Sequence, residues 1–387
     1  MSYQLGNSDI VELTEWRREL HRFPEISGEE AQTARRVEDR LRALGPDRLL
    51  TGLGGHGVAA VFEGAAEGPG IMIRCELDAL PIPEISTFDH RSQVPGKGHL
   101  CGHDGHMSMV MAVARALSRQ RPEKGRVVLM FQPAEEDGSG AAAVISDPRF
   151  EAIRTDYALS LHNMPGLPLG SVSLRRGPVN CASRGMRIGL NGRTAHASDP
   201  ATGVSPMAAL ARLMPELTAL GHGNGPEDAG FTLATVTHAR LGEATFGVAP
   251  GEAELWVTLR TMLDADMADL VSRAEALVAD CATEAGLEQR IDYHDVFRHC
   301  ENDPEAVELL TRAMAAEGLT PGKAGQPMRA SEDFGRFGDH AKAAMFLLGA
   351  GESCPSLHNP DYDFPDELIP IGARIFLRAV DQLLNET

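Results

Sequence analysis

The chain contains 387 residues, of which 43% are hydrophobic and 24% are charged, and its formal net charge is −19 at pH 7. This composition is typical of a globular protein, and the length predicts two or three domains at roughly 150 residues each. An acidic surface disfavours nucleic acid and anionic membranes as partners, and because no stretch resembles a signal peptide or a membrane span, we expect a cytoplasmic protein.

Helical and strand patterns alternate over the first 178 residues. We expect a helix over 9–20, a second helix that follows residues 27–30 and ends near 44, strands at about 57–63 and 71–77, a loop over 84–98, a helix over 107–117, and strands at 126–131 and 157–161. Ser27-Gly-Glu-Glu30 has the form of a capping box, and the continuous apolar run 126–131 is typical of a strand buried on both faces. The alternation predicts a mostly parallel sheet covered by helices.

The pattern changes after Gly177-Pro178. The expected order is strand 184–190, helix 204–220, strands 231–241 and 251–260, helix 264–285 and strand 290–296. This βαββαβ order is that of a ferredoxin-like module. Beyond it, a strand at 344–348 and a closing helix ending at 384 return to the first pattern. We therefore predict an α/β fold with one helix-covered domain over 1–180 and 297–387 and an inserted ferredoxin-like domain over 181–296.

The segment His99-Leu-Cys-Gly-His-Asp-Gly-His106 contains three imidazoles, a thiol and a carboxylate within eight residues. All of these side chains bind or position divalent metals when deprotonated. Gly102 permits a bend that would bring Cys101 and His103 to one ion. The six cysteines of the chain have no repeated spacing, so we expect reduced thiols and an available Cys101. The segment predicts a metal site.

Residues of metal-ligand type also follow other predicted strands. They are Glu135 and Glu136 after strand 126–131, His162 at the end of strand 157–161, and His358 after the strand near 344–348. Because the carboxyl ends of parallel strands share one edge of a sheet, we expect these groups to meet there. Of the two adjacent glutamates, one can bind metal while the other takes a proton from water as a general base.

Six segments occur in order along nearly the whole chain. They are Arg-Arg-Glu-Leu-His-Arg-Phe-Pro-Glu (17–25), Glu-Leu-Asp-Ala-Leu-Pro-Ile (76–82), Cys-Gly-His-Asp-Gly-His (101–106), Phe-Gln-Pro-Ala-Glu-Glu (131–136), Ser-Glu-Asp-Phe (331–334) and Leu-His-Asn-Pro-Asp-Tyr-Asp-Phe (357–364). This ordered set resembles the metal-dependent amidohydrolase branch of the M20 peptidase family, which includes hippurate hydrolase, N-acyl-amino-acid amidohydrolases and plant auxin-conjugate hydrolases.

The resemblance implies a catalytic domain with a smaller inserted lid that often also forms a dimer contact, so a homodimer is expected. It implies two divalent ions, which the mixed ligand types favour as zinc or manganese, with cobalt or nickel also able to serve. The implied ligands are Cys101 as the bridging thiolate and His103, Glu136, His162 and His358.

The resemblance also implies roles for residues that hold no ion. Glu135 matches the general base, Asp78 matches a position that orients a ligand, and His196 matches a lid histidine that reaches the substrate carbonyl. Glu76 stands where this branch more often has Asp. The expected reaction is hydrolysis of an N-acyl amino acid or related small amide by metal-activated water, with Glu135 moving the proton and His196 stabilising the oxyanion.

The predicted lid departs from the family pattern around His196. Thr194-Ala195 stand where Gly-Gly is more common, Asp199-Pro-Ala replaces a segment that usually brings a second His, and Phe246 stands where Asn is common. Since lids contact the substrate, these changes bear on substrate identity. The alternatives are a dipeptidase or carboxypeptidase with the same metal centre, or a non-catalytic metal-binding or ligand-binding relative. A binding module needs no uncoordinated base, which argues against the latter.

Overall fold

The computed structural model describes residues 3–385, which form two compact units. The first unit contains the described residues up to Val179, Cys300–Gln326 and the residues from Asp333 onward, and the second contains Asn180–His299 and Pro327–Glu332. The predicted domain ranges differ from these units mainly at Pro327–Glu332, which clusters with the second unit although it follows the expected insertion. In the described part of the chain, no helix is long and apolar enough to cross a membrane.

The first unit contains a seven-stranded sheet in the order β1-β2-β4-β3-β5-β15-β6. Its strands are β1 (Arg48–Leu53), β2 (Gly57–Glu63), β3 (Ala66–Glu76), β4 (Lys124–Gln132), β5 (Tyr157–Pro165), β6 (Val172–Ser173) and β15 (Lys342–Gly351). The four central strands β4, β3, β5 and β15 pair in parallel, whereas β1, β2 and β6 join antiparallel at the edges. The predicted helix-covered, mostly parallel central sheet is confirmed.

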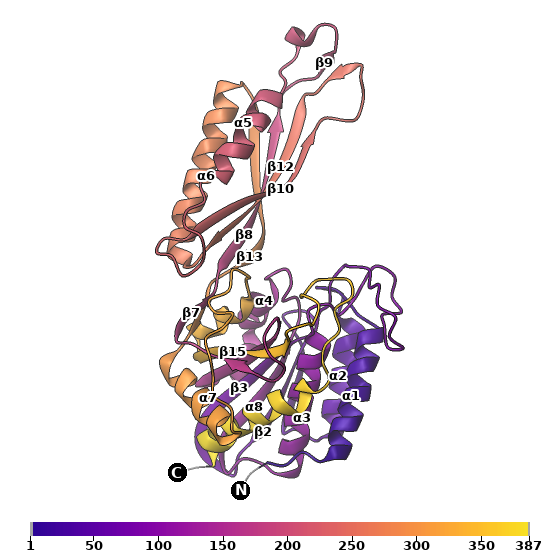
Figure 1. The fold of residues 1–387 in the computed structure, drawn as a ribbon, viewed down its shortest axis with the longest axis vertical. Coiled ribbons are helices and arrows are strands. Elements are labelled where there is room, and N and C mark those ends of the chain that lie inside the picture. Colours follow the sequence, from indigo (N-terminus) through magenta and orange to yellow (C-terminus); the bar gives the residue numbers. More distant parts are fainter. Residues whose placement is uncertain (1–2, 386–387) are drawn as a thin grey trace. The chain divides into compact units, whose positions relative to one another are not determined.

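Helices cover both faces of this sheet (Figure 1). They are α1 (Asn7–Arg22), α2 (Ala31–Ala43), α3 (His103–Arg119), α4 (Gly140–Ser146), α7 (Pro304–Ala316), α8 (Leu368–Leu384) and the 3-10 helices η1 (Pro148–Ile153) and η3 (Asp333–Asp339). Alternate residues of the central strands, such as Ile71, Leu129 and Phe346, join α1, α3 and α8 in one hydrophobic core. The opposite strand residues are also buried, as the apolar sequence of 126–131 predicts.

The second unit is the predicted ferredoxin-like module. Its elements are β8 (Ala182–Asn191), β9 (Ala195–His196), η2 (Pro200–Thr202), α5 (Met207–Thr218), β10 (Thr232–Leu241), β11 (Val248–Ala249), β12 (Glu252–Thr261), α6 (Asp264–Glu284) and β13 (Glu288–Phe297). The main sheet has the order β10-β12-β8-β13 and is antiparallel throughout. Helices α5 and α6 pack on one face of it (Figure 1) and share a separate core with it. Two short strands, β7 (Gly177–Asn180) and β14 (Cys300–Asn302), pair where the chain leaves and rejoins the first unit.

Two local predictions were wrong. Helix α2 begins after Glu30, and no side chain caps it, because the hydroxyl of Ser27 donates instead to Asp78 Oδ2 at 2.7 Å. Helix α3 begins at His103 rather than after His106, so the second half of the metal-rich segment forms its first turn. Strand β1 and helix α4 were not predicted.

Candidate metal centre

The carboxyl edge of the central sheet brings together the residues that were predicted to meet there, and Asp78, which follows β3, joins them. Glu135 follows β4. His162 lies within β5, and His358 lies in the loop after β15. Cys101 belongs to the turn that leads into α3. Because β4, β3, β5 and β15 are parallel neighbours, their carboxyl ends lie at one edge of the sheet.

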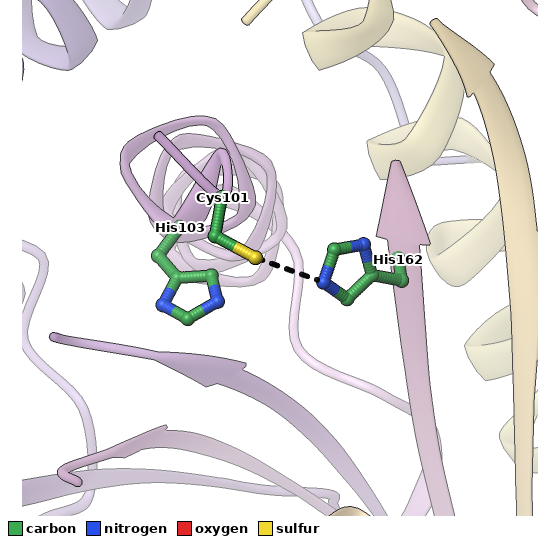
Figure 2. A group of neighbouring side chains, drawn as sticks. All are labelled: Cys101, His103 and His162. Atoms are coloured by element: carbon green, nitrogen blue, oxygen red, sulfur yellow. Dashed lines mark hydrogen bonds between the residues drawn. The ribbon is translucent and has the colours of Figure 1, made fainter. Parts of the chain in front are cut away.

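Cys101, His103 and His162 form one set of candidate ligands. One ligand atom from each lies within 4.8 Å of the others. Figure 2 shows the Cys101 thiol beside the ring of His162, with Sγ 3.5 Å from Nε2, and His103 one residue beyond Gly102 at the start of α3. All three side chains are buried.

The glutamate pair and His358 complete the group. Cys101, Glu136 and His358 form a second set of ligand atoms within 4.8 Å of one another, and His103, Glu135 and Glu136 form a third. His103 Nε2 lies 3.8 Å from Glu136 Oε1 and 3.9 Å from Glu135 Oε2. His358 Nε2 lies 3.6 Å from Glu136 Oε2. Glu136 therefore lies near two imidazoles, His103 and His358, and Glu135 lies near His103.

The backbone at this edge adopts left-handed conformations at several positions, among them Gly102, Ala134 and His358. Gly102 has φ of 89°, and a Cβ there would lie 2.5 Å from Asn163 Oδ1, so only glycine fits. Ala134 and His358 have φ of 49° and 65°, which is uncommon for residues with a side chain. The amide of Ala134 donates to Glu30 Oε1 at 2.8 Å and that of His358 donates to Leu100 O at 2.8 Å. Such conformations concentrate at functional sites.

Asp78 contacts both His103 and the turn that contains Glu135 and Glu136, here called the glutamate turn, and holds them in place. Its backbone oxygen lies 2.8 Å from His103 Nδ1, which directs Nε2 toward the glutamates. Its carboxylate accepts hydrogen bonds from the Ser27 hydroxyl at 2.7 Å and from the Glu136 amide at 3.0 Å. This arrangement is the one that orients ligating histidines in metalloproteins.

The carboxylates near His103 and Cys101 favour positive charge at this site. Although burial alone lowers the pKa of His103, the carboxylates of Asp78, Glu76 and Glu136 outweigh it and raise that pKa to about 10. Burial lowers the pKa of His162 to about 3, with His106 adding to the effect, so this ring is neutral and able to bind a metal. Burial and the nearby glutamates raise the pKa of the Cys101 thiol well above its ordinary value. A cation would displace that proton.

These residues fit a divalent metal ion. Nε2 of His103 is buried and has no hydrogen-bond partner among residues 3–385, which is costly for a polar atom unless a ligand satisfies it. The donor set combines one thiol, three imidazoles and two carboxylates, all common ligands of zinc and related metals.

The other polar residues of the 99–106 segment serve different contacts. Asp104 points away from the group, where its Oδ2 lies 2.9 Å from Arg17 Nε and 2.8 Å from His21 Nδ1. His99 is buried and belongs to no group of candidate ligands in the described chain. The density of metal-type residues in this segment therefore reflects two neighbouring polar networks rather than one.

Sequence reasoning missed a buried network beneath the glutamate turn. The guanidinium of Arg74 donates to Asp333 Oδ1 at 2.7 Å and to Gln132 Oε1 at 2.9 Å, and it also pairs with Glu76. Asp333 in turn accepts the amide of Ala141 at 2.7 Å, which anchors the segment after the turn. Two charged residues, Arg74 and Glu76, within the otherwise apolar strand 71–77 were the available signal.

His196 lies in the second unit, on the short ladder where it pairs with Val248. Its side chain is exposed, and its Nδ1 lies 2.7 Å from the Ser198 hydroxyl. Phe246 is also fully exposed, and the next residue, Gly247, accepts the amide of Ala197 at 3.1 Å. The departures from the family pattern are thus neighbours of His196 within this unit.

A central parallel sheet that presents a thiol, imidazoles and adjacent carboxylates at its carboxyl edge defines a metal-dependent hydrolase. The chain belongs to peptidase family M20/M25/M40, whose model matches residues 72–382.

Comparison with individual proteins agrees with this family. The chain is 31% identical over 369 residues to N-acetyl-L-cysteine deacetylase of Bacillus subtilis, covering 93% of this chain and 85% of that protein. It is 29% identical over 375 residues to hippurate hydrolase of Campylobacter jejuni, covering 95% and 96%. A Bacillus subtilis structure described as a dinuclear metal binding peptidase from the M20 family matches with a TM-score of 0.81 at 24% identity, over 99% of this chain and 100% of that one. The predicted family and the class of enzyme, an M20-type amidohydrolase, are confirmed.

Proposed function

We propose that this protein hydrolyses the amide bond of an N-acyl amino acid or a related small amide, with two divalent metal ions. The observation that supports the proposal is the pair of adjacent glutamates after β4, in which Glu136 lies near both His103 and His358 and Glu135 lies near His103. Adjacent carboxylates allow one to bind metal while the other acts as a base, and we assign Glu136 as the ligand and Glu135 as the base. The named activities of the relatives, deacetylation of N-acetyl-L-cysteine and hydrolysis of hippurate, support amides of this class.

Five side chains would hold the ions. They are the side chains of Cys101, His103, Glu136, His162 and His358. The ions would supply a Lewis acid that polarises the amide carbonyl and makes water acidic enough to attack near neutral pH. Zinc or manganese suits this mixed donor set, and cobalt or nickel would also serve. Asp78 orients His103 through the backbone contact at 2.8 Å.

Glu135 is the proposed general base. It is 5% exposed, so its carboxylate lies in surroundings where a proton transfer is little disturbed by solvent. It accepts the proton of the attacking water and passes it to the leaving amine. Such a residue typically contributes about 10²- to 10⁴-fold to the rate.

The second unit would act as a lid. We assign His196 to stabilisation of the oxyanion, a contribution whose loss costs on the order of 10²- to 10³-fold. The exposed aromatic side chain of Phe246, beside the His196 segment, would contact the substrate and help to set its identity. We further propose that the protein is cytoplasmic and a homodimer, as the family resemblance implies.

The test is amine release by metal-loaded protein from N-acetyl, N-benzoyl and longer N-acyl amino acids and from free dipeptides. We expect release from acylated compounds, with Glu135→Gln slower by about 10²-fold or more although its metal content is unchanged. Release from dipeptides alone would instead assign the protein as a dipeptidase or carboxypeptidase. If the metal-loaded protein released no amine from any of these compounds, the proposed substrate class would be refuted.

A further inference from the structure

A buried polar chain runs behind the candidate ligands. Glu76 lies at the end of β3, and its Oε2 accepts a hydrogen bond from His106 Nδ1 at 2.6 Å. The other ring nitrogen of His106 lies 2.5 Å from Asn163 Oδ1. His106, on the first turn of α3, thereby connects β3 with β5. Glu76, His106 and Asn163 are all buried, so these contacts form away from solvent.

His106 packs beside two of the proposed ligands, His103 and His162. Its ring centroid is 5.6 Å from that of His103 and 5.0 Å from that of His162, the latter in an edge-to-face arrangement. Since protein interiors are close-packed, neither ligand ring can rotate toward His106 while it is in place.

Asn163 transmits this restraint to the ligands. Its backbone oxygen lies 2.8 Å from His162 Nδ1, which leaves Nε2 directed at Cys101. Its side-chain amide occupies the space next to Gly102, where a Cβ would lie 2.5 Å away. The side chain that His106 holds is therefore in contact with the turn between Cys101 and His103.

We propose that His106, held by Glu76, is a positioning residue that fixes His162 and the Cys101–His103 turn for metal binding, and is not itself a ligand. Glu76, His103 and His106 do bring ligand-type atoms within 4.8 Å of one another. However, both ring nitrogens of His106 already have hydrogen-bond partners, Glu76 at Nδ1 and the side chain and backbone amide of Asn163 at Nε2, so neither nitrogen is available to a cation. The inference rests on the metal site of the proposed function.

Two substitutions separate the two contacts of His106. His106→Asn retains a polar atom near the position of Nδ1, facing Glu76, but loses the contact with Asn163. His106→Gln retains one near the position of Nε2, facing Asn163, but loses the contact with Glu76. The matched control is His99→Gln, which removes an equally buried imidazole from the same segment, one whose ring nitrogens have no hydrogen-bond partner in the part of the chain that the structure describes.

The measurements are metal equivalents bound, the dissociation constant by competition with a chelator, and the visible spectrum of the Co²⁺ form. We expect His106→Asn to bind the same number of ions as the wild type but about 10- to 100-fold more weakly, with a shifted thiolate-to-cobalt band. His106→Gln should lose less affinity, and His99→Gln should match the wild type.

Either of two results would overturn the inference. One is an affinity within about twofold of the wild type in both His106 variants, and the other is the loss of a whole metal equivalent, which would make His106 a ligand. If His106→Asn does not fold, Asn163→Ser applies the same test, because it keeps the backbone oxygen and removes the amide. Failure of the wild type to bind ions would instead refute the metal site of the proposed function.

Discussion

Alanine at position 102 tests whether the turn between Cys101 and His103 is shaped by its neighbour Asn163. Gly102 has φ of 89° and a Cβ there would lie 2.5 Å from Asn163 Oδ1. Gly318, which follows α7, offers a matched control, because it has φ of 75° and nothing within 4 Å of an added Cβ. Both alanines carry the left-handed backbone cost, and only Gly102→Ala must also displace a buried side chain.

The two costs differ enough to be measured. A left-handed alanine costs about 1–2 kcal/mol, which applies at both positions. Overfilling a packed site adds about 1–3 kcal/mol at position 102 alone, for a total of about 2–5 kcal/mol. At about 3 °C per kcal/mol for a unit of this size, Gly102→Ala should lower the melting temperature of the first unit by about 6–15 °C, against about 3–6 °C for Gly318→Ala.

Differential scanning calorimetry of the metal-free protein provides the comparison, since it can resolve separate transitions of the two units. Chelator competition then asks whether metal affinity falls with Gly102→Ala and stays constant with Gly318→Ala. Equal melting shifts and equal metal affinities in the two variants would refute the reasoning, because the contact with Asn163 would then impose no constraint on the turn.

Two further predictions concern buried and partly buried charge. Arg74→Met removes the guanidinium that Glu76 and Asp333 share, and leaving buried carboxylates without it should destabilise the first unit by about 3–5 kcal/mol in thermal unfolding; an unchanged melting temperature would contradict this. The hydrogen bond from Arg119 lowers the pKa of Asp9 despite its burial, so the stability that Asp9 contributes is present above its ordinary pKa of about 4 and is lost as the pH falls below it. The difference in melting temperature between the wild type and Asp9→Asn should therefore shrink between pH 5 and pH 2, and a constant difference would argue against the ion pair.

The convergence of the candidate ligands was predictable because it depends on strand type alone. Continuous apolar runs such as 127–131, within the predicted strand 126–131, indicate parallel strands, and the carboxyl ends of parallel strands meet at one edge whatever the details of packing. Placing His162 and Glu136 near Cys101 required only the order of elements. The ferredoxin-like order of the second unit was also predictable, because turns and hydrophobic periodicity mark its helices and strands locally.

The contacts within the site were not predictable in this way. Ser27 has the local pattern of a capping residue, but its hydroxyl donates to Asp78, 51 positions away in the chain. Asp104 lies among metal ligands in the sequence and yet pairs with Arg17. Local sequence favours the nearest polar partner, whereas the fold supplies partners from distant segments whose positions depend on the packing of whole elements.

The most direct test of the proposed function is a metal titration of chelator-treated protein, in which amine release from an N-acyl amino acid and bound metal are measured on the same samples. We expect no release without metal, an increase up to two equivalents, and binding of the same two equivalents by Glu135→Gln with at least about 10²-fold slower release. Release by the metal-free protein, or wild-type turnover by metal-loaded Glu135→Gln, would contradict the proposed mechanism.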